Sequence, residues 1–251
     1  MDNRHDKLGI KQTVQKHWMD KTVQMLLAGV SEKEIRSELN EYLSTQKQSG
    51  GTGQRGEKTY GMAIALLAAW FSPHAELIDF RNDALALARS VSVTDWLPLH
   101  WAVISAAYPF WFNVAKQTGR LLNLQDQVTQ SQIFNRLKER YGDRETVARN
   151  ARYTVRSFVA WGVLNDSEAK GCYEKADPVS IYDSNLAILM LESALLTTPE
   201  AKCAMGLLLN TPAFFPFQLP VMTGDFVSQH SDRIEVVRYG LDDDLLKLKG
   251  N

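Results

Sequence analysis

Residues 129–175 have the sequence TQSQIFNRLKERYGDRETVARNARYTVRSFVAWGVLNDSEAKGCYEK, and this stretch decides the fold. It predicts a short helix over Thr129–Tyr141, a break at Gly142, a long basic helix over Arg144–Trp161 and a polar hairpin around Gly171. Helix, tight turn, second helix and small β-wing is the layout of a winged helix-turn-helix, whose second helix lies in the DNA major groove.

Positive charge is concentrated on and just before these two helices. From Lys116 to Arg156 the sequence holds nine Lys or Arg against four Asp or Glu, whereas the whole chain has a net charge of −1. Backbone phosphates attract a local patch of this kind whatever the total charge of the protein. The charge distribution therefore favours double-stranded DNA as a partner.

The long basic helix has two opposite faces. At about 100° per residue, its apolar residues share one side, which we expect to pack inward. These apolar residues are Val147, Ala151, Val155 and Phe158. Arg149 and Arg156 lie nearly opposite this apolar side and only about 20° from each other around the helix axis. Arg152 and Tyr153 lie beside them. Because a guanidinium forms paired hydrogen bonds with guanine or phosphate, we expect the three arginines to contact the groove. We expect Tyr153, which lies beside them, to contact it as well.

Other polar residues of the segment are candidate contacts to the DNA backbone. Such contacts position a protein on the duplex without reading its sequence. The candidates are Arg144, Lys138, Gln130 and Gln132 on the two helices, and Lys170 and Lys175 in the hairpin. Asn150 is less well placed for groove contact.

Two other interpretations of the basic face stay open. Winged helices also bind proteins, so the segment can serve a scaffold subunit that meets a larger enzyme. It can also belong to a transcriptional regulator of its own operon. Only DNA contact through several phosphates predicts that binding weakens steeply with salt.

The expected elements divide the chain into five parts. They are an N-terminal helical pair (1–45), a flexible linker (46–57), a helical domain (58–125), the winged helix-turn-helix (126–176) and a C-terminal α/β region (177–251). The predicted fold class is mainly α, a helical bundle with a winged helix-turn-helix and a small mixed α/β C-terminal region.

Hydrophobic periodicity predicts six further helices. They are Thr13–Ala28, Ser31–Leu43, Thr59–Trp70, Pro73–Ala88, Thr94–Thr118 and Ser184–Thr197. Ser31 and Glu34 have the spacing of a capping box, and Pro109 is expected to kink or end its helix. The segment LLAGVSEKEIRSELN has a second interpretation as a helix-turn-helix, although a docked helical hairpin is favoured.

The C-terminal region is acidic, with ten acids and five bases from Asp177 onward, and is expected to face away from DNA. Arg233–Tyr239 has strand character. We expect the tail Leu241–Leu248, which contains three consecutive aspartates, to be a solvated end rather than a Mg²⁺ site.

The sequence does not indicate an enzyme. The aromatic run from Trp96 to Phe112 lacks interleaved basic residues, so a core role is favoured over stacking on bases. His100 is expected to be a hydrogen-bonded core histidine. Residues 51–56 (GTGQRG) match a dinucleotide fingerprint formally, but polar residues precede them where the fingerprint needs an apolar strand. We expect no catalytic residue, metal or cofactor.

The expected location is the cytoplasm, without a membrane span. Cys172 and Cys203 are the only cysteines, and a polar start of the chain gives no signal peptide. Gly61–Phe71 is apolar but too short for a bilayer, and Cys203–Met222 is interrupted by Asn210 and three prolines.

The order of parts resembles that of the BrxA component of BREX phage-defence systems. The resemblance lies in LLAGVSEKEIRSEL (26–39), an all-helical middle, and the segment from Thr129 to Leu164. It covers roughly Thr13–Leu164 in layout, and the aromatic-rich middle and the acidic region after Asp177 depart from it. It implies a small cytoplasmic DNA-binding accessory protein beside larger defence enzymes, with no catalytic residue. A related bacterial defence-island family fits the layout equally well.

Overall fold

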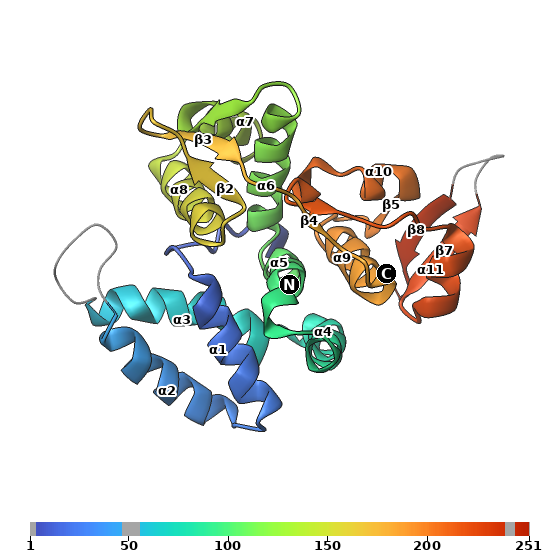
Figure 1. The fold of residues 1–251 in the computed structure, drawn as a ribbon, viewed down its shortest axis with the longest axis horizontal. Helices are drawn as coiled ribbons and strands as arrows, with labels where there is room; N and C mark the ends of the chain where they lie inside the picture. Colours follow the sequence, from blue (N-terminus) through green and yellow to red (C-terminus); the bar gives the residue numbers. More distant parts are fainter. Residues whose placement is uncertain (1–3, 47–55, 239–243, 251) are drawn as a thin grey trace.

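The computed structural model describes residues 4–46, 56–238 and 244–250. These ranges are mainly helical, with eleven α-helices and three small β-sheets. In Figure 1, helices α5 (Leu97–Ala107) and α6 (Pro109–Leu122) run through the middle of the molecule. The first four helices lie below them in that view, the segment around α7 (Gln130–Tyr141) and α8 (Glu145–Ala160) above, and the C-terminal region beside them.

The N-terminal part consists of four helices. They are α1 (Lys16–Leu27), α2 (Glu32–Ser44), α3 (Glu57–Phe71) and α4 (Ile78–Ser90). The predicted capping box is confirmed, because the Glu34 amide donates to Ser31 Oγ and the Ser31 amide donates to Glu34 Oε2 at 3.1 Å. Most of the predicted linker, with five of the six fingerprint residues, lies outside the described residues. Its last residue, Glu57, begins α3.

The predicted helix Thr94–Thr118 is two helices, because the chain breaks at Tyr108 and Pro109 opens α6. Proline suits this position, since the first amides of a helix have no intrahelical acceptor. The other aromatic residues of this run are buried as expected: Trp96, Trp101, Phe110, Trp111 and Phe112. Trp101 stacks on Phe158 of α8 with 5.0 Å between ring centroids, so the aromatic core joins the middle helices to α8.

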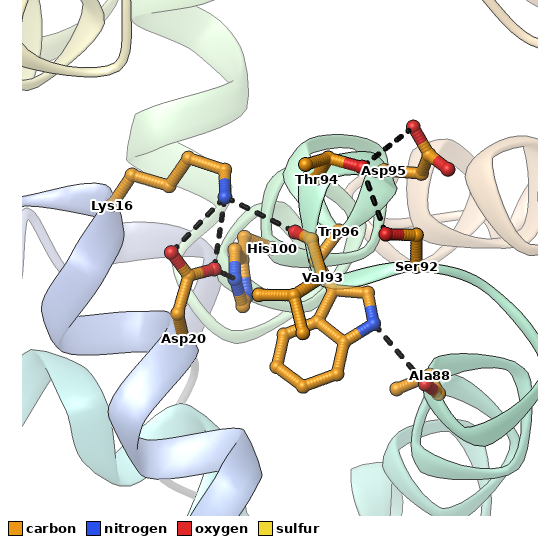
Figure 2. Close-up of polar contacts among 9 residues, drawn as sticks. All are labelled: Lys16, Asp20, Ala88, Ser92, Val93, Thr94, Asp95, Trp96 and His100. Carbon is orange, nitrogen blue, oxygen red and sulfur yellow. Dashed lines mark hydrogen bonds and ion pairs between the residues drawn. The ribbon is translucent and has the colours of Figure 1, made fainter.

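His100 is a hydrogen-bonded core histidine, as predicted. It is fully buried on α5, and its Nε2 donates to Oδ1 of Asp20 on α1 at 2.8 Å (Figure 2). Lys16 Nζ lies 2.9 Å from the same carboxylate oxygen. Burial lowers the pKa of His100, against the opposing effect of Asp20, so the imidazole is neutral at neutral pH. The network connects α1 to the central helix.

The C-terminal region packs on α5 and α6 through helix α9 (Ser184–Leu196) and a one-turn helix at Pro212–Phe214. A Cβ on Gly119 of α6 would lie 1.9 Å from the Pro212 carbonyl oxygen, so a glycine is required for this approach. The remaining elements are β4 (Val179–Ser180), β5 (Lys202–Ala204), α10 (Met205–Leu209), β6 (Phe217–Gln218), α11 (Gly224–His230), β7 (Ile234–Arg238) and β8 (Asp244–Leu248).

The expectation of a solvated C-terminal tail is wrong for the part that the structure describes. Residues Asp244–Leu248 form β8, which lies between β5 and β7 in an antiparallel sheet, with Leu246 fully buried. Leu246 and Leu248 are buried and Lys247 between them is partly exposed, an alternation that suits a strand with one buried face. Asp242 and Asp243 lie outside the described residues.

Within the described ranges, no single helix is both long and apolar enough to cross a membrane. Helix α3 and the following segment Ala75–Ser90 meet that criterion only together, as a pair bent by 54°.

Candidate nucleic-acid interface

Helices α7 (Gln130–Tyr141) and α8 (Glu145–Ala160) are joined by a short turn. Thr129 caps α7 with a second capping box, in which Gln132 N donates to Thr129 Oγ1 at 3.1 Å and Thr129 N to Gln132 Oε1 at 2.7 Å. Gly142 ends the helix with a φ of 78°, a conformation that side chains rarely adopt. The predicted helix, break and helix are therefore present.

A three-stranded sheet lies beside the two helices. Strands β2 (Leu164–Asp166) and β3 (Cys172–Lys175) form the predicted hairpin, with Gly171 at a φ of 79°. Strand β1 (Gln127–Thr129), which precedes α7, pairs with the other side of β3 to give the order β1-β3-β2. Sequence analysis missed β1, because three residues directly before a helix are too short for a periodic signal.

Helix α8 has the two faces that its periodicity predicts. Its apolar face is buried: Val147, Ala151, Val155 and Phe158 are each no more than 2% exposed. Arg149, Arg152 and Arg156 are exposed, and Tyr153 is half-buried. The packed face also receives the N-terminal segment, since Val14 N donates to Ser157 Oγ at 3.0 Å and Trp161 Nε1 donates to Val14 O at 2.9 Å.

The three arginines differ in their partners. Arg156 Nη1 lies 2.6 Å from Asp166 Oδ1 on β2, and both side chains are about half exposed. Arg149 and Arg152 form no ion pair or hydrogen bond with any described residue. Within the described ranges, two guanidinium groups of α8 therefore have no carboxylate partner, and one is paired with the hairpin.

Arg152 and Arg156 line a hollow of about 910 Å³ between α8, the start of α7 and the hairpin. Lys170 and Gln130 contribute to the same hollow. Tyr173 of β3 also lines this hollow, and its hydroxyl donates to Gln130 Oε1 at 3.4 Å. Burial raises the pKa of Tyr173, against the opposing charges of Arg156 and Arg152, so the phenol remains a neutral donor.

Most of the other side chains that we expected to contact the DNA backbone already contact residues of their own segment. Lys138 pairs with Asp143 at 3.1 Å, and Arg144 Nη2 donates to Tyr141 O at 3.0 Å. The Gln132 side chain completes the cap of α7, so its observed contacts are structural. Lys175 is exposed at the end of β3.

The hairpin also contributes negative charge. Asp166, Glu168 and Glu174 lie in or beside its strands, and residues 126–176 hold nine Lys or Arg against seven Asp or Glu. The positive excess is therefore concentrated on the helices, and the acidic hairpin forms one border of the arginine face.

Sequence analysis missed a set of cations near Arg149. Lys7, Lys11 and Lys58 come from the N-terminal segment and α3, and they line a second hollow together with Arg149. Neither periodicity nor motif connects residues 7–58 with residue 149, because only the packing of α3 and the N-terminal segment places them there.

No protein-family model, curated protein or solved structure matches this chain. Both cysteines are free thiols. In the ranges that the structure describes, no three His, Cys, Asp or Glu side chains are grouped so that they can hold a metal ion.

Proposed function

We propose that residues 126–176 are a winged helix-turn-helix and that the protein binds double-stranded DNA without catalysing a reaction. The observation that carries this proposal is the exposed arginine face of α8, opposite a face that is fixed in the core. A helix inserted into the major groove needs both properties, because its base contacts must be held in place by the rest of the domain. The order α6, β1, α7, α8, β2 and β3 supports the winged type.

Charge gives a second argument. Arg149 and Arg152 have no carboxylate partner among the described residues, so neither must lose an ion pair before it contacts DNA. Phosphate or guanine acceptors satisfy such guanidinium groups with bidentate, charge-assisted hydrogen bonds. The proposed contacts are Arg149, Arg152, Tyr153 and Arg156 in the groove, with Lys170 beside it.

Fluorescence anisotropy with a mixed-sequence duplex tests this proposal. The triple variant Arg149→Ala, Arg152→Ala, Arg156→Ala should lose most of its affinity and keep the melting temperature of the wild type. A matched control removes three exposed cations elsewhere through Lys33→Ala, Arg89→Ala and Lys202→Ala. Wild-type affinity should also fall by orders of magnitude between about 50 and 200 mM salt. Equal affinities of wild type and the arginine variant would exclude this interface.

A binding role for the same face in a protein assembly, such as a defence complex, predicts a different result. Partners recovered from the native host would then remain bound after nuclease treatment, and the triple variant would lose them. Regulation of its own operon predicts protection of one upstream DNA site in a footprint.

A further inference from the structure

A second hollow lies against the N-terminal half of α8, apart from the one beside the hairpin. Its volume is about 610 Å³. The segment Lys7–Lys11 forms one wall, Lys58 and Met62 on one face of α3 form another, and α8 contributes Arg149 and Asn150. Three segments that are distant in sequence thus enclose one site.

The walls of this hollow are strongly basic. Lys7, Lys11, Lys58 and Arg149 line it, and none of the described residues that line it is acidic. The side chains of Lys11, Lys58 and Arg149 form no ion pair or hydrogen bond with the described part of the chain. Lys11, Lys58 and Arg149 carry like charges that repel one another, so a bound anion would stabilise their arrangement.

Asn150 adds a polar group that needs a partner. Its side chain is only 7% exposed, and its Nδ2 donates to Thr146 O at 2.8 Å. Its buried Oδ1 has no hydrogen-bond partner in the described residues. A buried acceptor without a donor costs free energy. Because this oxygen is closed off from solvent in the structure, we expect the side chain to turn toward the hollow when an N–H or O–H group of a ligand satisfies it.

The remaining walls suit a flat, partly apolar group. Leu8 and Met62 supply apolar surface, and Tyr153 supplies an aromatic ring. Aromatic side chains stack on nucleobases, and an asparagine amide pairs with the amino edge of adenine. The volume also lies within the range of about 300–1,000 Å³ that is usual for small-molecule sites.

We propose that this hollow binds a nucleotide, with its phosphates at Lys11, Lys58 and Arg149 and the amino group of its base at Asn150. A nucleotide combines the anion, the planar ring and the hydrogen-bond donor that the walls require. A free nucleotide and a nucleotide within a DNA strand present the same chemistry. The site goes beyond the proposed groove contact, because Lys11, Lys58 and Asn150 take no part in that contact.

Isothermal titration calorimetry of the full chain with ATP tests the site. The wild type should bind ATP saturably, and the double variant Lys11→Ala, Lys58→Ala should bind it about tenfold more weakly or worse, because each replaced cation removes a charge-assisted contact. The double variant Lys33→Ala, Lys202→Ala removes the same charge from exposed positions on other elements and should bind like the wild type. Absence of ATP binding at millimolar concentration would overturn the proposal.

Titration with inorganic pyrophosphate distinguishes the contribution of the base to binding from that of the phosphates. Asn150→Leu, which keeps the side-chain size but removes the acceptor, should weaken ATP binding and leave pyrophosphate binding unchanged. Equal affinity of the wild type for pyrophosphate and ATP would overturn the assignment of a nucleotide. The melting temperature of Asn150→Leu checks that this variant is folded.

Competition identifies the source of the nucleotide. Displacement of ATP by a short single-stranded oligonucleotide, lost in Lys11→Ala, Lys58→Ala, assigns the site to a nucleotide within a strand, and no displacement assigns it to a free one. The double variant Arg152→Ala, Arg156→Ala, at the other hollow, should bind ATP normally. A wild type that binds ATP but not duplex DNA would contradict only the proposed groove contact, and a wild type that binds duplex DNA but not ATP would contradict only the nucleotide site.

Discussion

Arg156 of α8 is paired with Asp166 of the hairpin, with Nη1 2.6 Å from Oδ1. This ion pair links the proposed recognition helix to the proposed wing and at the same time places a carboxylate beside a proposed DNA contact. An exposed pair of this kind contributes little to stability, at most about 1 kcal/mol. We therefore expect the ion pair to act mainly by reducing the positive charge at the proposed DNA interface.

Asp166→Asn should increase the affinity for duplex DNA. The change frees Arg156 and removes a negative charge that repels phosphate, so we expect roughly a threefold to tenfold gain and a steeper salt dependence, by about one phosphate. Anisotropy titrations at several salt concentrations measure both quantities. Asp225→Asn changes the same charge in an exposed pair with Arg238, far along the chain, and should have no effect. Unchanged affinity in Asp166→Asn would remove Arg156 from the interface.

The Arg156–Asp166 ion pair also predicts which of two arginines contributes more to duplex binding. Arg152→Ala should cost about 1–3 kcal/mol of duplex binding, whereas Arg156→Ala should cost less, because Asp166 already neutralises part of its charge. In the Asp166→Asn background the cost of Arg156→Ala should rise. A double-mutant cycle from anisotropy data measures this coupling, and a coupling energy of zero would show that the ion pair does not modulate binding.

The sequence predicts those parts of the site that depend on local pattern. The apolar stripe from Val147 to Phe158 follows the helix period, so the outward direction of Arg149, Arg152 and Arg156 was predictable. Gly142 and Pro109 mark helix boundaries through their own backbone chemistry, and both boundaries are where expected.

Features that depend on distant contacts were not predictable. Strand β1 exists because β3 pairs with it, and β8 is a strand because β5 and β7 flank it, although its first residue continues an acidic run that is typical of a solvated tail. The Arg156–Asp166 pair and the cations around Arg149 likewise depend on how separate segments pack. No local pattern encodes such contacts.

Gly142→Ala should destabilise the protein by about 1–3 kcal/mol, because a φ of 78° strains any residue with a Cβ. A Cβ at this position would meet no atom within 4 Å, so the cost comes from the backbone and not from a clash. Urea unfolding measures the change. Gly61→Ala is the matched control: Gly61 lies inside α3 with open space around it, and alanine there should stabilise by about 0.5–1 kcal/mol. Equal effects of the two changes would contradict the assigned turn.

The buried His100 should make stability depend on pH below neutrality. Burial lowers its pKa in the folded state, whereas the unfolded chain titrates near the usual value of about 6.5. Above that pH both states carry a neutral imidazole, and this group then has no effect on the pH dependence. As pH falls below about 6.5 the unfolded state takes up a proton that the folded state refuses, so the free energy of unfolding decreases.

Urea unfolding between pH 7.5 and 5 measures this loss, which for one histidine amounts to at most about 1.4 kcal/mol per pH unit. His5 and His17 add to the loss, since burial lowers the pKa of each as well. His100→Gln, whose amide can still donate to Asp20, should flatten the dependence, and His74→Gln, at an exposed position, controls for the loss of an imidazole. An identical pH dependence of wild type and His100→Gln would show that His100 is not held neutral in the core.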